Sequence, residues 1–585
     1  MNESQKEYIR AHQRSMTARQ MARALGLSRP EVERWLKQPN PGSQPGTAGM
    51  ALPAESSGSR ALEWLLLIWV AALLVRTVFF VLLRQSPFFE PLTPTLDDGI
   101  YYGMAREIIG GNWLGAEPLS AYRVPAYPFF LAMIFVFAGV SVAAAHAVQL
   151  FVGSLGCILV YFMTRAVTGS TRAALWAAAI MAAYLPLVFY EMLLLGESIS
   201  IFLNLSAMIC LLMLVRREGR GMYWALPAGL LLGLSSLLRP NTLLVAVAVG
   251  GFVVIWFWTK RRSPQRAFAC AFLLGAGVLA TLLPMTARNY VLHKDILPVS
   301  ALGGINLYIG NNPEADGKFS LVKEFGTSFN TMVESSIRIA EKASGRPLKP
   351  SEVSSYWVQK TRDYAFAQPG DLLKKAALKT AYLFNAYEFP DVLDMSFAAR
   401  LIPALSPAAG MYGILVVFAA LGFAGTWGPG RRAGLWLMDV FWGAYALSVV
   451  LFFVSSRYRL PIVVFLVPYA ALGANRAWDL IRRRAVRGVR PAEVILVVAM
   501  TVVAFWPVEP VDFSVNYNSL AIAMKNKGKM GEAEKYYLEA IRTNPHYPSP
   551  YYNLSLLYRE TGRNREAAQM RAKYEEAARA VGIRP

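Results

Sequence analysis

Long apolar blocks alternate with short polar segments along most of this chain. A block of about 20 residues is the length that an α-helix needs to cross the hydrocarbon core of a bilayer. Eleven blocks approach this length, at roughly 62–83, 142–164, 172–190, 193–215, 222–238, 241–259, 266–287, 409–427, 434–454, 459–479 and 491–508. The pattern therefore predicts an all-α, polytopic membrane protein with about 11 transmembrane helices.

Basic residues gather in five clusters between these blocks, and loops rich in Lys and Arg stay on the cytoplasmic side of a membrane. The clusters are Arg165 and Arg172; Arg216, Arg217 and Arg220; Lys260, Arg261, Arg262 and Arg266; Arg431 and Arg432; and Arg482, Arg483, Arg484, Arg487 and Arg490. If the N-terminus is cytoplasmic, all five clusters fall on the cytoplasmic side. We therefore expect a multi-pass protein of the bacterial inner membrane, with its C-terminus in the periplasm. The first apolar block is too long for a signal-peptide core, so we expect no cleavable signal.

This orientation leaves two large segments on the outer side, residues 84–141 and 288–408. Residues 126–140 are apolar but short, and counting them as a span would move three basic clusters outside. We therefore expect a helix that lies in the outer interface. Residues 371–389 show an amphipathic pattern and are expected to lie there too.

Composition limits the function classes. Hydrophobic residues make up 55% of the chain and charged residues 17%, against about 25% charged in soluble domains. The net charge of +21 suggests a nucleic-acid partner, but the arginines cluster between apolar blocks, so we expect no nucleic-acid partner for the protein as a whole. The three cysteines lie inside apolar blocks and the four histidines are scattered, which predicts neither a disulfide framework nor a histidine zinc site.

Both ends of the chain are polar. Residues 1–37 resemble a cytoplasmic helix-turn-helix, with a break at Gly26 inside 16–36; the alternative is a helical hairpin that does not contact DNA. Residues 38–60 are rich in Pro, Gly and Ser and are expected to form a flexible linker. Residues 511–585 repeat with a period of 34 residues, as in Tyr517 and Tyr551, Leu520 and Leu554, Gly528 and Gly562, and Ala533 and Ala567. This repeat resembles the tetratricopeptide repeat (TPR), so we expect an outer TPR domain that docks on the membrane domain or on a protein partner.

Three carboxylates are the candidate catalytic groups. Asp97 and Asp98 follow the first span, and Glu197 stands just inside a span. A carboxylate can act as a general base toward an attacking hydroxyl, and a lone acid within a membrane segment suggests a function. The alternative for Asp97 and Asp98 is a helix N-cap.

Five arginines on the outer side run against the positive-inside bias. They are Arg123, Arg239, Arg288, Arg457 and Arg459. Guanidinium groups bind phosphate through paired hydrogen bonds, so we expect these residues to bind an anionic lipid phosphate or the carboxylates themselves. The alternative for any one of them is snorkelling to lipid headgroups.

A segment rich in Gly and Asn, residues 302–317, lies in the second outer region. Such a composition predicts a tightly turned loop with several positive φ values. We expect this loop to cover a cavity and to offer backbone amides to an anion; the alternative is a plain turn. The candidate substrate-contacting residues are Tyr122, Asn306, Tyr308, Asn311 and Asn312.

Taken in order, these motifs resemble the membrane-embedded GT-C glycosyltransferases. The resemblance is to glycosyltransferase family 39 and to the protein mannosyl and aminoarabinose transferases, over about residues 62–480. It rests on the Asp97–Asp98 pair, the stretch YRVPAYPFFLA, Glu197, and the turns LRPN, GGINLYIGNNP and SRYRLP.

The resemblance implies a polyprenyl-phosphate-linked sugar donor, hexose or pentose, that is used at the outer face with inversion. It implies Asp97 or Asp98 as the base or as a ligand of a divalent metal ion, with Glu197 in the same pocket and the arginines on the donor phosphate. The acceptor is a hydroxyl of a glycan, a lipid or a protein of the cell envelope. Two other readings stay open, a membrane-bound regulator with an outer TPR sensor, and a lipid or polysaccharide transporter.

Overall fold

The computed structural model describes residues 18–28, 58–93, 96–115, 119–216, 220–319, 322, 325, 329–428, 430–483, 489–509 and 512–580. The chain divides into two units, residues 1–56 and 57–585. The described part of the first unit contains the helix α2 (Ala18–Leu25), which ends at Gly26 with a φ of +65°. The second helix of the expected helix-turn-helix, and most of the expected linker, lie outside the described residues.

Among the described residues, nine helices are long and apolar enough to cross a membrane. Six of them are single helices: α4 (Gly58–Gln85), α7 (Val142–Thr168), α10 (Glu197–Arg216), α13 (Pro264–His293), α20 (Ala433–Leu451) and α21 (Ser456–Arg483). Three others join a short turn of 3-10 or π geometry: η2 (Arg220–Trp224) with α11 (Ala225–Leu238), α12 (Thr242–Ile255) with η3 (Trp256–Lys260), and η5 (Pro403–Ala408) with α19 (Met411–Thr426).

The prediction of an all-α, multi-pass membrane protein is confirmed. Two of the eleven expected spans are not single long helices in the structure. The expected span 172–190 is divided into α8 (Thr171–Ala183) and α9 (Leu185–Glu191), which are bent by 52°. The expected span 491–508 contains α22 (Pro491–Ala504), a helix of 14 residues that packs along α19. Length and composition thus support nine spans, or ten with the bent pair, in the part of the chain that the structure describes.

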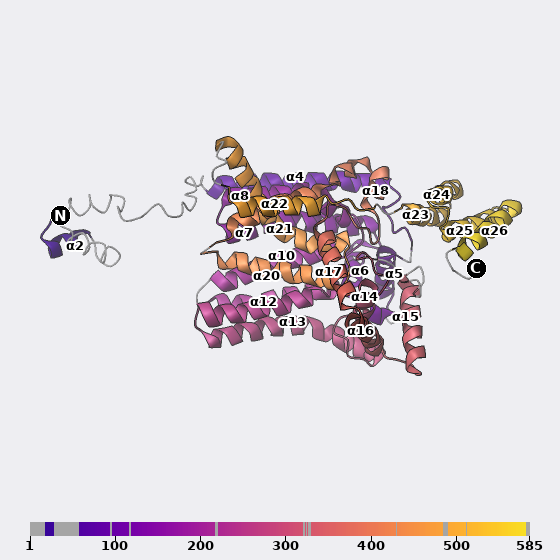
Figure 1. Ribbon diagram of the computed structural model, residues 1–585, viewed down its shortest axis with the longest axis horizontal. Helices are drawn as coiled ribbons and strands as arrows, with labels where there is room; N and C mark the ends of the chain where they lie inside the picture. The colour runs from indigo at the N-terminus through magenta and orange to yellow at the C-terminus, as the bar shows by residue number, and fades with distance from the viewer. Residues whose placement is uncertain are drawn as a thin grey trace. The chain divides into compact units, whose positions relative to one another are not determined.

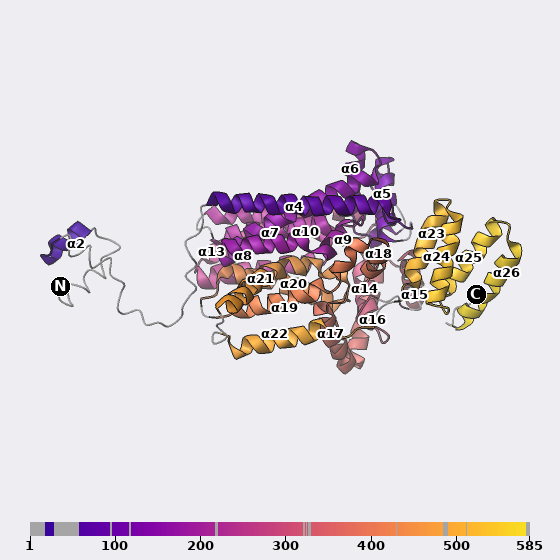
Figure 2. The ribbon, with the colours of Figure 1, turned by 90° about the horizontal axis from the view of Figure 1, so that it is seen from above.

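The long helices lie side by side in a bundle, and seven shorter helices gather at one of its ends (Figures 1 and 2). These seven are α5 (Asp97–Ile109), α6 (Ala126–Ala138), α14 (Leu302–Gly310), α15 (Phe329–Ser344), α16 (Pro350–Ala367), α17 (Pro369–Phe384) and α18 (Met395–Leu401). They correspond to the two outer segments expected from the sequence. With 13 residues, α6 is too short to span a bilayer, in agreement with its treatment as an interfacial helix.

The basic clusters meet at the opposite end of the bundle. Arg216 donates a hydrogen bond to the carbonyl of Ala166 at 2.5 Å, and Arg172 lies 3.7 Å from Asp479. Because α10 runs 20 residues from Glu197 to Arg216, its two ends are separated by about 30 Å. The positive loops and the outer segments are therefore on opposite sides of the bundle, as the positive-inside pattern requires.

One sequence expectation is wrong. Residues 302–310 form the helix α14 instead of a tight loop, and within 302–317 only Gly317 has a positive φ. The glycines serve close packing instead: a Cβ on Gly304 would collide with the backbone of Ser354 in α16, and one on Gly310 would collide with the carbonyl of Phe452. Glycine density alone does not distinguish a turn from a close helix contact.

Two helix pairs close the described chain: α23 (Ser514–Asn526) with α24 (Met530–Thr543), and α25 (Pro548–Glu560) with α26 (Asn564–Ala580). Gly528 and Gly562 have φ values of +75° and +77° in the turns between the paired helices, 34 residues apart. This spacing follows the repeat seen in the sequence.

The first of these helix pairs packs against the outer end of the bundle. The ring of Tyr517 lies 4.9 Å from that of Phe397 in α18, and Arg400 stacks 4.5 Å from the ring of Phe513. Lys527 is 3.0 Å from Glu90. These contacts place the repeats beside the segment that connects α4 to α5.

Candidate active site

The ends of several helices bring charged side chains to one place at the outer end of the bundle. Asp97 is the first residue of α5 and Glu197 is the first residue of α10. Arg239 follows the last residue of α11, where Pro240 prevents the helix from continuing. A helix N-terminus stabilises a negative charge and a helix C-terminus stabilises a positive charge. The local structure therefore favours the charged forms of these three side chains.

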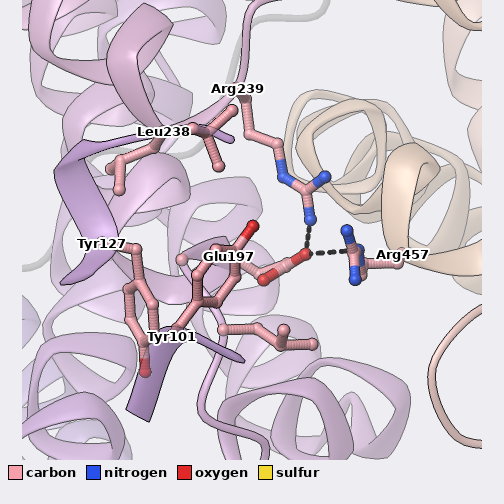
Figure 3. A pocket seen from close by; sticks show the side chains of 9 residues that line it. Tyr101, Tyr127, Glu197, Leu238, Arg239 and Arg457 are labelled. Atoms are coloured by element: carbon pink, nitrogen blue, oxygen red, sulfur yellow. Dashed lines mark ion pairs between the residues drawn. The ribbon is translucent and has the colours of Figure 1, made fainter. Parts of the chain in front are cut away.

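Arg457, the second residue of α21, is the centre of the site and is only 4% exposed. Its Nη1 donates to Oδ2 of Asp97 at 2.8 Å. Its Nε lies 3.0 Å from Oε1 of Glu197 and 3.3 Å from Oδ2 of Asp391. Three carboxylates from three distant parts of the chain therefore surround one guanidinium (Figure 3 shows the Glu197 contact).

Glu197 also forms an ion pair with Arg239, which is drawn in Figure 3. The Glu197 side chain is 1% exposed, and the Arg239 guanidinium also stacks 4.8 Å from the ring of Tyr458. Two guanidinium groups and three carboxylates leave the cluster with one negative charge when all are ionised. Charges interact more strongly in such a dry environment than in water, so this excess is a defining property of the site.

The adjacent acids Asp97 and Asp98 differ in environment. Burial favours the neutral form of Asp97, but the Arg457 guanidinium outweighs it and lowers the pKa of that carboxyl. Burial raises the pKa of Asp98 to about 7, and the neighbouring Asp97 charge acts in the same direction. Oδ1 of Asp98 has no hydrogen-bond partner among the residues that the structure describes. The N-cap of α5 is Leu96, without a side-chain bond, so Asp97 and Asp98 stand in the first turn of the helix and not at its N-cap.

A small pocket opens beside the charged cluster. Glu197, Arg239 and Arg457 form its polar wall, and Tyr101, Val124, Tyr127, Leu195, Gly196 and Leu238 form the rest (Figure 3). The space that a water-sized molecule can occupy is only about 10 Å³, so the pocket is nearly closed in this structure.

Two of the five expected phosphate-binding arginines, Arg239 and Arg457, line this pocket, while Arg459 does not. Arg459 donates to the carbonyls of Asn385 and Tyr387 at 2.7 and 2.9 Å and lies 2.9 Å from Glu388. It holds the segment between α17 and α18 against α21. Its role in this structure is to position that segment.

The other two arginines are placed differently again. Arg123 is buried, donates to Oδ1 of Asn330 at 2.7 Å, and lies near enough to Asp97 to contribute to its lowered pKa. Arg288 donates to the carbonyls of Leu114 and Gly115 at 2.6 and 3.0 Å. Arg123 thus borders the cluster, whereas Arg288 holds the loop after α5.

The expected substrate loop does not join the charged cluster. Tyr122 is buried in a separate apolar cluster, which the side chain of Tyr308 contacts from the edge, 4.7 Å from the ring of Trp357. Asn306 lies half-buried on α14.

Asn311 and Asn312 close the end of α14 by donating to the carbonyls of Leu307 and Tyr308 at 2.8 and 3.0 Å. Oδ1 of Asn311 also accepts a hydrogen bond from the buried Lys379 at 2.8 Å. These contacts connect the end of α14 to α17 and are separate from the pocket.

The sequence analysis missed Asp391. It stands in an outer segment that holds many other acids, and nothing in its spacing marks it. A hint is the run FPDVLDM itself, in which two carboxylates, Asp391 and Asp394, interrupt apolar residues. Asp391 reaches the site because Arg459 fixes the preceding residues onto α21.

The carboxylates of the site surround a guanidinium and not one another's oxygens. No group of three or more His, Cys, Asp or Glu side chains is arranged to hold a metal ion in the described ranges. Asp97, Glu197 and Asp391 face a guanidinium instead of one another.

No protein-family model and no curated protein matches the chain. Among solved structures, it is similar to the apo form of an oligosaccharyltransferase from Archaeoglobus fulgidus, with 14% identity, a TM-score of 0.45, and coverage of 83% of this chain and 58% of that one. It is also similar to AglB from the same organism in complex with an inhibitory peptide and a dolichol-phosphate, with 15% identity, a TM-score of 0.41, and coverage of 81% and 58%.

A further similar structure is ArnT from Cupriavidus metallidurans bound to undecaprenyl phosphate, with 14% identity, a TM-score of 0.31, and coverage of 74% of this chain and 82% of that one. The chain spans 58% of the length of the archaeal oligosaccharyltransferase, and similarity at this level does not assign its activity.

Proposed function

We propose that this protein is a glycosyltransferase that moves a sugar from a polyprenyl-phosphate donor to an acceptor hydroxyl at the periplasmic face of a bacterial inner membrane. The observation that carries the proposal is the meeting of Asp97, Glu197, Arg239 and Arg457 beside one pocket at the outer end of the bundle. The site lies at the end of the bundle opposite the basic loops, which we take to be the outer face. Nucleotide sugars are made in the cytoplasm, so a donor linked to a membrane lipid fits a site at this face.

The charged groups suit the two halves of this reaction. The acceptor oxygen forms a bond to the anomeric carbon as the bond between that carbon and the phosphate oxygen breaks. A carboxylate takes the proton of the acceptor hydroxyl, and the electron pair of the broken bond stays on the lipid phosphate. Arg239 and Arg457 are placed to stabilise that phosphate through hydrogen bonds that strengthen as its charge grows.

Asp97 is the stronger candidate for the base on position. Its Oδ2 shares the guanidinium that lines the pocket, and its side chain is 20% exposed. Asp98 is more buried and has a pKa of about 7, so it adds little negative charge while it is protonated. A base must first be within reach of its proton, and its pKa is considered second.

The test uses the full-length protein in its host membrane. Cells that lack the protein are supplied with the wild type, Asp97→Asn, Asp98→Asn, or the control Asp479→Asn at the basic end of α21. Lipid extracts and envelope glycans are then compared by mass spectrometry. We expect Asp97→Asn to slow sugar transfer by about 100-fold or more. Cells with this variant should lack the transferred sugar and accumulate its lipid-linked donor.

Asp479→Asn removes a carboxylate that is far from the pocket and should behave as the wild type. Full transfer by both Asp97→Asn and Asp98→Asn, at normal protein levels, would exclude a base role for this pair. An unchanged lipid and glycan profile in cells without the protein would exclude the transferase itself.

A further inference from the structure

Asp391 is a carboxylate of the site to which the proposed transfer reaction assigns no role. It lies between α17 and α18, its side chain is 11% exposed, and its Oδ2 is 3.3 Å from Nε of Arg457. The residues before it are held by Arg459, and the carbonyl of Phe389 accepts a hydrogen bond from the backbone of Ser456 at 2.9 Å. Its position beside Arg457 is therefore built into the fold.

Two carboxylates compete for one N–H of Arg457. Glu197 and Asp391 both approach Nε, which carries a single hydrogen. Nε of Arg457, Oε1 of Glu197 and Oδ2 of Asp391 all lack a hydrogen-bond partner among the described residues, although they lie within ion-pair distance. The arrangement is crowded with negative charge, and an anion can enter only if a carboxylate gives way.

Asp391 is the carboxylate that is held least strongly. Asp97 accepts a true hydrogen bond from Nη1 of Arg457, and Glu197 has a second partner in Arg239. Both also begin helices, whose N-terminal dipoles stabilise an acid. Asp391 lies outside the helices and has the longest ion pair of the three. The pKa of the Asp391 carboxyl is raised: burial and the Asp97 charge raise it, and the Arg457 guanidinium offsets only part of this effect.

The backbone around Asp391 is anchored on both sides. Arg459 and Ser456 fix residues 385–389 on one side, and the Asp394 carboxylate caps α18 by accepting from the backbone of Phe397 at 3.0 Å on the other. Only residues 390–393 lie between these anchors. Displacement of the Asp391 carboxylate from Arg457 therefore requires rotation of its side chain and no movement of the helices on either side.

We propose that Asp391 is a displaceable counter-ion that occupies Arg457 in the unliganded protein and leaves when a lipid-linked phosphate binds there. This inference rests on the proposed function, because it takes Arg457 to be the phosphate ligand. One negative charge replaces another, so the charge of the cluster is nearly the same in both states. Asp391 then weakens binding of the lipid phosphate and speeds release of the lipid phosphate left after transfer.

The test measures binding of farnesyl phosphate, a short polyprenyl monophosphate, to the full-length protein in lipid nanodiscs. The variants are Asp391→Asn and Asp391→Ala, each alone and combined with Arg457→Gln. The control is Asp363→Asn, which removes a carboxylate that is 58% exposed on α16. Farnesol, which lacks the phosphate, serves as the control ligand.

We expect Asp391→Asn and Asp391→Ala to lower the Kd for farnesyl phosphate by about tenfold, because a competing like charge is removed. Arg457→Gln should weaken binding and abolish the effect of the Asp391 substitutions. Asp363→Asn should not change the Kd, and no variant should change binding of farnesol.

Unchanged or weaker binding in both Asp391 variants, with protein that elutes as the wild type in size-exclusion chromatography, would overturn the inference. If that result comes with binding that still depends on Arg457, only the counter-ion role fails. If farnesyl phosphate binds neither the wild type nor the Asp391 variants, or binds them equally well without Arg457, the phosphate site of the proposed function fails as well.

Discussion

A buried ion pair inside the bundle gives the sharpest stability prediction. Arg76 of α4 donates two hydrogen bonds to the Glu191 carboxylate at the end of α9, at 2.7 and 2.9 Å. Both side chains are 1% exposed. The carboxylate occupies the space beside Gly153 of α7, where a Cβ would overlap it. The pair therefore connects three helices at a site that excludes water.

Removing one member should cost far more than removing both. Arg76→Met leaves the Glu191 charge buried without a partner, and such changes destabilise proteins by about 3–5 kcal/mol. In the double variant Arg76→Met with Glu191→Gln, no charge is left, and we expect a loss of about 1 kcal/mol. The difference between the two is the coupling that a double-mutant cycle measures.

The assay is unfolding of the purified protein in mixed micelles with increasing sodium dodecyl sulfate, followed by tryptophan fluorescence. Arg84→Met, at an exposed position on the same helix, is the matched control and should change the free energy of unfolding by less than about 0.5 kcal/mol. A double variant that is as unstable as Arg76→Met, or a single variant with the stability of the control, would refute the reasoning.

Three further outcomes are expected. The pKa of Asp98 is raised to about 7, so the folded state keeps a proton that the unfolded chain loses above about pH 4. The free energy of unfolding should therefore fall by up to about 4 kcal/mol as pH rises from about 4 to about 7. Asp98→Asn should remove this contribution, and an identical pH dependence in that variant would contradict the assignment. Gly277→Ala places a Cβ 2.5 Å from the backbone of α11 and should destabilise by about 1–3 kcal/mol in the same unfolding assay, whereas Gly251→Ala, with no atom within 4 Å, should not. Arg400→Ala removes the stacking contact with the terminal helix pairs and should speed proteolytic release of residues 512–580, as followed by gel electrophoresis; an unchanged cleavage rate would show that this contact does not hold them.

The sequence by itself determined the architecture of this protein. Burial in lipid is a local property of about 20 consecutive residues, so the apolar blocks could be read directly as helices. The positive-inside pattern then placed Asp97, Glu197, Arg239 and Arg457 on one side, and the structure has them in one cluster. Helix ends are marked locally as well, for example by Pro240 after Arg239.

The partners of these charges were decided only by the tertiary structure. Arg457 and Arg459 are two residues apart, yet one faces Asp97 and the other faces Glu388, because successive positions on a helix point in different directions. Asp391 joins the site through contacts between segments that are far apart in the chain.

The same reason explains why the sequence does not reveal the pairing of Arg76, inside an apolar block, with Glu191, beside one. It also explains why the glycines of α14 suggest a turn in the sequence. Hydrophobicity is summed along a segment, whereas a counter-ion or a close helix contact depends on which distant surface the fold places beside a residue. A single sequence carries the first kind of information and not the second.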